Sequence, residues 1–105
     1  MRTLVKFSFP NDTMNDLVQS GKIGEVMERI LRDLKPEASY FTTDENGERG
    51  GFIVIDVKDP SELPRISEPF FLECNARVKL SPVMNVEDLK KGLASLRQLA
   101  GAARG

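Results

Sequence analysis

Glu37 and Tyr40 are close together in the sequence and could perform acid–base chemistry on a bound molecule. A carboxylate can act as a general base, and a phenol can donate a proton or a hydrogen bond to a ligand. The alternative is that Glu37 is a solvated residue at the start of a strand and that Tyr40 packs on an edge strand with its hydroxyl in water. The residue types favour this second interpretation.

Arg49 lies between glycines, in the segment 47–51. Its planar guanidinium group could bind a substrate carboxylate through two parallel hydrogen bonds. The alternative, which we favour, is a turn in which the glycines supply positive φ angles and Arg49 stays in water. The segment is not a phosphate-binding loop, because it lacks the Lys-Ser/Thr pair and precedes no helix.

The segment 68–71, with sequence EPFF, places a carboxylate beside two aromatic rings. Adjacent rings after a helix-ending proline should point in different directions, one into the core and one towards a cleft or partner. A desolvated Glu68 would then have a raised pKa. An equally good interpretation is a packed corner between a helix and a strand. The side chains that we predict to line a pocket are Glu37, Tyr40, Arg49, Phe52, Glu68, Phe70 and Asn75.

Two further residues have chemistry that depends on their burial. Asp56 lies on an otherwise apolar segment. It would need Arg77 or Lys79 as a partner if buried, but its position near the end of that segment favours exposure. We predict that Cys74 is a structural thiol, because the sequence fixes no cation near it to lower its pKa.

The composition excludes several classes of function. The 105 residues include no His and one Cys, so neither a His-ligated metal or haem nor a Ser-His-Asp unit can be built. We therefore predict no cofactor and no metal. The net charge of −1 gives no reason to expect a nucleic-acid or membrane partner, and no apolar run is long enough to span a membrane. The lone Cys is compatible with the cytoplasm.

Hydrophobic periodicity predicts alternating strands and helices. Val5, Phe7 and Phe9 alternate with polar residues, as in a strand with one buried face. The remaining predicted elements are helices at 12–19 and 23–34, strands at 37–43 and 52–57, a short helix at 60–68 ended by Pro69, a strand within 72–83, and a final helix capped by Asn85.

This order is β-α-β-β-α-β with an additional C-terminal helix, so we predict an α+β, ferredoxin-like antiparallel sheet. Residues 1–99 would form one domain and residues 100–105 a frayed tail. Right-handed crossovers place both helices on one face of the sheet. On the third strand the other face would carry either Ile53, Ile55 and Val57 or Phe52, Val54 and Asp56, and both sets contain large apolar groups. Because such apolar patches mark interfaces or pockets, we expect a second copy to cover this face, giving a dimeric α/β barrel.

Four segments carry a resemblance to a known group of proteins: LKPEASYF at 34–41, GERG at 47–50, SEPFF at 67–71 and PVM at 82–84. Together they resemble a family of small uncharacterised bacterial proteins. That family is similar to the dimeric α/β barrels that include muconolactone isomerase and small-molecule monooxygenases. The resemblance implies the fold and the dimer, but no particular reaction. Many of those relatives depend on His, Trp or haem, and this chain has neither His nor Trp.

Three functions follow as hypotheses. The first is a cytoplasmic homodimer, or higher homo-oligomer formed through the sheet face, that binds a small apolar or aromatic acid in its barrel. The second is a cofactor-free isomerase or monooxygenase that uses Glu and Tyr to transfer protons on a small aromatic or lactone substrate. The third is a non-catalytic assembly or interaction module. The sequence leaves open whether the protein is an enzyme.

Overall fold

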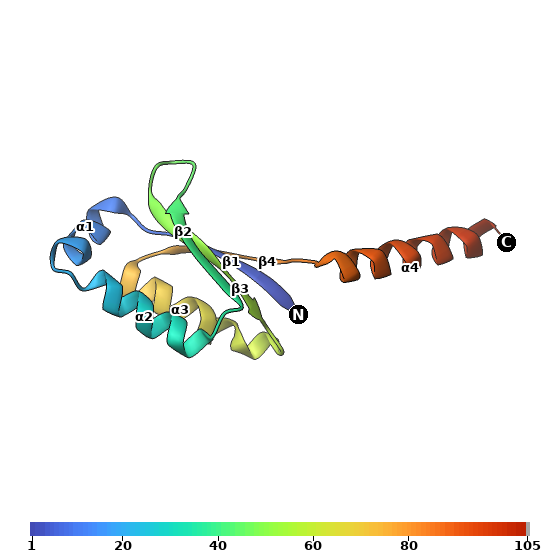
Figure 1. Cartoon of the computed structure of the whole chain (residues 1–105), viewed down its shortest axis with the longest axis horizontal. Helices are drawn as coiled ribbons and strands as arrows, with labels where there is room; N and C mark the ends of the chain where they lie inside the picture. Colours follow the sequence, from blue (N-terminus) through green and yellow to red (C-terminus); the bar gives the residue numbers. More distant parts are fainter. Residues whose placement is uncertain (105) are drawn as a thin grey trace.

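Four antiparallel strands form one sheet in the order β2-β3-β1-β4. The computed structural model describes residues 1–104. Helices α1, α2 and α3 gather on one side of the sheet, and α4 extends away from it (Figure 1). The elements are β1 (Arg2–Ser8), α1 (Asn11–Gln19), α2 (Ile23–Leu34), β2 (Ala38–Thr43), β3 (Arg49–Asp56), the 3-10 turn η1 (Pro60–Glu62), α3 (Leu63–Cys74), β4 (Arg77–Pro82) and α4 (Val86–Arg104).

The core lies between the sheet and the helices. Val5 of β1 and Ile53 of β3 are opposite one another and fully buried. From α3, the ring of Phe70 stacks on that of Phe7, with centroids 4.6 Å apart. Burying a side chain of this size contributes about 1.5–3 kcal/mol. Because the helices pack on one face of an antiparallel sheet, the predicted α+β class and antiparallel sheet are confirmed.

Strand β3 begins earlier than the sequence predicts, at Arg49 rather than Phe52. Gly50 and Gly51, which we expected in a turn, belong to the strand and are buried. A Cβ on either would lie 2.3 Å from a carbonyl oxygen of a neighbouring strand, that of Phe7 or Tyr40 respectively. These glycines are needed because the three strands approach so closely that no side chain fits.

Helix α3 does not end at Pro69, and the prediction of a strand beginning at Leu72 is wrong. The helix continues to Cys74, and Asn75 ends it in the left-handed conformation with φ of 50°. Proline removes one backbone hydrogen bond from a helix. Ile66, Phe70 and Cys74, spaced four residues apart, are all fully buried. Their packing on one helical face outweighs the loss at Pro69.

The predicted break between the first two helices is confirmed at Ser20 and Gly21, and α2 has the predicted bounds. At Gly21 φ is 75°, a conformation that favours glycine. The chain leaves α2 through Lys35, which has φ of 48°, and then enters Pro36. This exit directs the chain back towards the sheet and into β2.

Helix α4 differs from the other helices in having no buried residue among 86–101, although Asp88 in its first turn lies 3.8 Å from Arg2. Its start matches the prediction: Asn85 Oδ1 accepts a hydrogen bond from the Asp88 backbone N–H at 2.8 Å, and the Asn85 N–H donates to Asp88 Oδ2 at 3.1 Å. The tail predicted to fray from residue 100 instead stays helical to Arg104, in keeping with the high helix propensity of its alanines. Every residue from Val86 to Gly101 is exposed.

Candidate functional site

The open face of the sheet, opposite the helices, carries an ordered set of side chains. The strand register places Lys6 of β1 between Lys79 of β4 and Phe52 of β3, and it places Phe52 beside Tyr40 of β2. We call these four residues the Lys–aromatic row. It is cationic on the β4–β1 side and aromatic on the β3–β2 side.

A second row of side chains lies on the same face, two residues away along each strand. Leu4 is opposite Val54, Val54 is opposite Ala38, and Leu4 is also opposite Ser81. Leu4, Val54 and Ala38 are only half-buried in the single chain. The open face therefore combines an apolar surface with two adjacent ammonium groups.

The aromatic end of the Lys–aromatic row is formed by two side chains that the sequence assigns to a pocket. The rings of Tyr40 and Phe52 have centroids 5.5 Å apart. Tyr40 is 61% exposed, so its ring offers an accessible surface rather than part of the core. An exposed aromatic pair of this kind can stack on a planar ligand.

A hollow of about 360 Å³ lies beside this row. Lys6, Lys79, Arg77 and Phe52 line it at the β4–β1–β3 side, and the carboxylates of Asp44 and Glu45 line it at the β2–β3 turn. Ser8 is opposite Gly50 across this part of the sheet, so the strands carry little side-chain bulk there. The hollow is therefore a consequence of the small residues that close strand packing requires.

The cations beside the hollow differ in their partners. A guanidinium nitrogen of Arg77 lies 3.8 Å from a carboxylate oxygen of Glu48. Within residues 1–104, neither Lys6 nor Lys79 forms an ion pair. Two unpaired ammonium groups beside an aromatic pair can bind a carboxylate attached to an apolar or aromatic group.

Glu37 and Arg49 lie away from the Lys–aromatic row. The carboxylate of Glu37 accepts a hydrogen bond from Arg2 Nε at 2.5 Å, and this ion pair raises the pKa of Arg2. Arg49 Nη1 donates to Asn15 Oδ1 at 2.9 Å, which ties the β2–β3 hairpin to α1. Each charged group already has a partner within the chain.

The three pocket residues predicted in and after α3 have different environments. Phe70 is fully buried in the core, whereas Phe71 is 41% exposed, so the two rings point in different directions as expected. Asn75 is the left-handed residue that ends α3. Glu68 is exposed and lies at a groove between α2 and α3. The structure thus brings together only Tyr40 and Phe52 of the predicted set.

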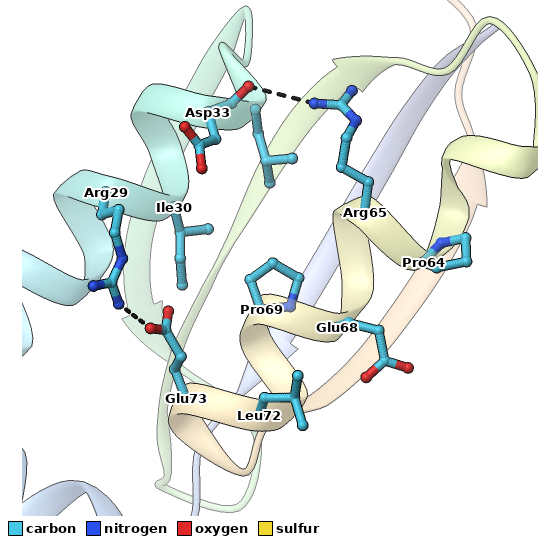
Figure 2. Close-up of a pocket in the computed structure, with 10 residues that line it drawn as sticks. Arg29, Ile30, Asp33, Pro64, Arg65, Glu68, Pro69, Leu72 and Glu73 are labelled. Carbon is cyan, nitrogen blue, oxygen red and sulfur yellow. Dashed lines mark hydrogen bonds and ion pairs between the residues drawn. The ribbon is translucent and has the colours of Figure 1, made fainter.

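That groove is a second hollow, of about 620 Å³, on the helical side of the molecule (Figure 2). Arg29 of α2 pairs with Glu73 of α3, and Arg65 donates to the Asp33 carbonyl oxygen at 3.4 Å. Between these contacts the lining is apolar, formed by Ile30, Leu34, Pro64, Pro69 and Leu72. The groove could not be predicted from a helix that ends at Pro69, because such a helix lacks Leu72 and Glu73.

The two residues whose chemistry depends on burial behave as predicted. Cys74 is fully buried, and burial raises the pKa of its thiol to about 11. Asp56 is exposed at the strand end, where its Oδ1 accepts a hydrogen bond from the Met1 amino group at 2.8 Å. That hydrogen bond, together with the positive charge of the amino group, lowers the pKa of Asp56.

Within residues 1–104, no three or more His, Cys, Asp or Glu side chains are arranged to hold a metal ion. In the same part of the chain, no helix combines the length and apolar character needed to cross a membrane. No protein-family model matches the chain, and no curated protein is significantly similar to it.

Proposed function

We propose that the protein is a homodimer that binds a small apolar or aromatic carboxylic acid between the open faces of two sheets. The strand order β2-β3-β1-β4, with α1, α2 and α3 on one side, supports a ferredoxin-like classification. Two such sheets facing each other would form a dimeric α/β barrel, as the sequence resemblance implies. The buried Cys74, with its raised pKa, is compatible with a reducing cytoplasm.

The observation that carries the ligand proposal is the Lys–aromatic row. Lys6 and Lys79 lie side by side on neighbouring strands, and Phe52 and Tyr40 continue the same row. A ligand whose carboxylate meets the two ammonium groups would place its apolar part over the two rings. This arrangement selects an anion with an attached apolar group over a neutral molecule of the same shape.

The need for a second copy follows from the shape of the open face. Small-molecule sites usually bury most of the surface of their ligand. The hollow beside the row is open to solvent in the single chain, and the half-buried Leu4 and Val54 extend the apolar surface along the sheet. A second sheet would cover both the ligand and this apolar surface, because stacked sheets pack about 10 Å apart.

Acid–base catalysis has less support from the same geometry. Glu37 is held by Arg2 and lines a charged hollow with Asp56 and Asp88, separate from the hollow beside the row. Tyr40 therefore has no predicted catalytic carboxylate beside it. We propose binding as the primary function, and the isomerase or monooxygenase hypothesis would require a different base.

Titration with benzoate, with benzamide as its neutral counterpart, tests this proposal. We expect amide NMR shifts of Lys6, Phe52 and Tyr40 to move with benzoate and to remain unchanged with benzamide. Hexanoate serves as a second apolar carboxylate. Because Tyr40 is the only Tyr and the chain has no Trp, hexanoate binding beside Tyr40 should also change the intrinsic tyrosine fluorescence. Equal affinity for benzoate and benzamide, or no binding of either, would overturn the ligand proposal.

Matched variants locate the site and test the dimer. The double substitution Lys6→Gln and Lys79→Gln should weaken benzoate binding at least tenfold, whereas Lys22→Gln and Lys58→Gln, which remove equal charge elsewhere, should not. Phe52→Asp should convert the sheet-face dimer into single chains in light scattering, because it buries a charge in the interface. An unchanged mass for this variant would contradict sheet-to-sheet pairing.

A further inference from the structure

Helix α4 carries an apolar stripe that nothing in its own chain covers. Leu89, Leu93 and Leu96 recur at the spacing of one helical face, and they are 45%, 50% and 61% exposed. Figure 1 shows the helix extending beyond the sheet, with its length in open space. Helices in proteins gain most of their stability from packing such a face and are marginal in water without it, so this stripe indicates an interface with another molecule.

Three apolar surfaces of a second copy could receive this stripe: another α4, the open face of the sheet, or the groove between α2 and α3. Charge distinguishes them. After its first turn, described residues of α4 carry only cations, Lys90, Lys91 and Arg97. A second α4 offers them no carboxylate beyond its first turn, and the open face presents Lys6 and Lys79. Neither surface complements the charge of α4.

The α2–α3 groove is lined by three carboxylates and two arginines, and both arginines already have partners: Arg29 pairs with Glu73, and Arg65 pairs with Glu62. The carboxylates of Asp33 on α2 and Glu68 on α3 are exposed and form no ion pair with any residue in 1–101. Figure 2 shows these two residues on opposite sides of the groove. Cations flanking a leucine stripe could therefore meet a carboxylate on either side of the groove.

The apolar parts also match in size. Leu72, at the groove, is 80% exposed and so has apolar surface left to bury. From Leu89 to Leu96 the stripe spans about 10 Å at 1.5 Å per residue. The groove side formed by α3 extends from Pro64 to Glu73, which is about 13 Å at the same rise. Three leucines thus fit within the length of the groove.

We propose that α4 of one copy docks in the α2–α3 groove of a second copy, with its leucines between the helices and its cations near Asp33 and Glu68. This is the helix-in-groove mode of recognition. The groove lies on the helical side of the sheet, away from the Lys–aromatic row. The interface is therefore separate from the proposed ligand site and goes beyond the proposed function.

Mass measurements of stripe variants test the role of α4. Leu93→Asp places a charge in the stripe, and Gln98→Asp places the same charge on the opposite side of the helix. We expect light scattering at micromolar concentration to show at least a twofold smaller assembly for Leu93→Asp than for the natural chain, and no change for Gln98→Asp. Equal masses for Leu93→Asp and the natural chain would overturn the proposal.

Charge reversal identifies the docking surface. We expect Asp33→Lys with Glu68→Lys to reduce assembly, and Lys90→Glu with Arg97→Glu to do the same. Combining all four substitutions should restore assembly, since the two surfaces are again complementary. If the groove variants leave assembly unchanged while Lys6→Glu and Lys79→Glu strengthen it, α4 docks on the open face and the groove assignment is wrong.

The same variants separate this inference from the ligand proposal. Leu93→Asp should retain the benzoate affinity of the natural chain, because the Lys–aromatic row is on the other side of the sheet. Loss of assembly with retained binding supports both proposals. Loss of benzoate binding in this variant would contradict the separation of the two surfaces.

Discussion

The two faces of the sheet are built from the same strands, yet they bury their side chains very differently. Along β1 and β3, Val5 and Ile53 point towards the helices and are fully buried, whereas Lys6 and Phe52 point the other way. The covered face has an apolar core supplied by one chain. The open face mixes apolar and cationic groups and has no cover. Strand alternation thus separates the face that forms the core from a face that keeps apolar side chains exposed in the single chain.

The largest expected difference between the two faces is in the free energy of unfolding lost when a phenylalanine is replaced on each of them. Phe70→Ala removes a fully buried ring from the covered side, so we expect the free energy of unfolding to fall by about 3–5 kcal/mol. Phe52→Ala on the open face should cost less than half as much in dilute solution, measured by urea unfolding. If two open faces pair as we propose, the cost of Phe52→Ala should grow with protein concentration, because only the paired state buries this ring. A cost independent of concentration would contradict that pairing.

The close approach of strands gives the next largest effect. Gly51→Ala would place a Cβ 2.3 Å from the Tyr40 carbonyl oxygen and 3.0 Å from the Phe7 ring, so we expect a loss of about 1–3 kcal/mol in the free energy of unfolding. Gly24→Ala in α2 is the matched control, because its Cβ would meet nothing within 4 Å. That control should be neutral or stabilising by up to about 1 kcal/mol. Urea denaturation of both variants checks the contrast, and similar costs would show that the strands can move apart.

The thiol on the covered side makes stability depend on pH. Burial raises the pKa of Cys74 from 9.0 to about 11, so the folded chain keeps its proton after the unfolded chain has lost it. The stabilisation is therefore complete below pH 9 and is lost as the pH rises towards 11, by roughly 2 kcal/mol. Cys74→Ala should lower stability at neutral pH but flatten this dependence in urea unfolding measured between pH 8 and 11. An equally steep dependence in the variant would assign it to other groups.

The sequence predicts elements well where the signal is local. The unbroken spacing of apolar residues in α2 predicts its bounds, and Asn85 predicts the start of α4. The bounds of α3 cannot be predicted in the same way. Proline is a local stop signal, but the burial of Phe70 and Cys74 is a tertiary effect that a local rule does not contain. The register of Gly50 likewise depends on a neighbouring strand.

The candidate site shows the same limit. Strand alternation places Phe52 on the face opposite Ile53 without saying which face is uncovered, and Tyr40 is the neighbour of Phe52 because the two strands form a hairpin. That Lys6 and Lys79 lie beside each other depends on the pairing of β1 with β4, at opposite ends of the folded domain's sequence. Spacing along the chain contains no such information. The carboxylate-binding half of the site therefore follows from topology, and only the aromatic half follows from sequence.

The smallest expected change in stability comes from the Glu37–Arg2 ion pair, which lies at the end of the open face away from the Lys–aromatic row. Glu37→Gln breaks an exposed ion pair with Arg2, so we expect only a small loss of stability in urea unfolding, because solvent screens exposed pairs. Because Glu37 lies outside the hollow beside the Lys–aromatic row, benzoate affinity should stay within twofold of the natural chain. Arg2→Gln breaks the same pair from the other side and also removes the ion pair of Arg2 with Asp88 at 3.8 Å, so its cost should be equal or slightly larger. A large loss of benzoate binding in Glu37→Gln alone would place this carboxylate at the ligand and restore it as a candidate general base, since an ion-pair role predicts equal effects on benzoate binding from both variants.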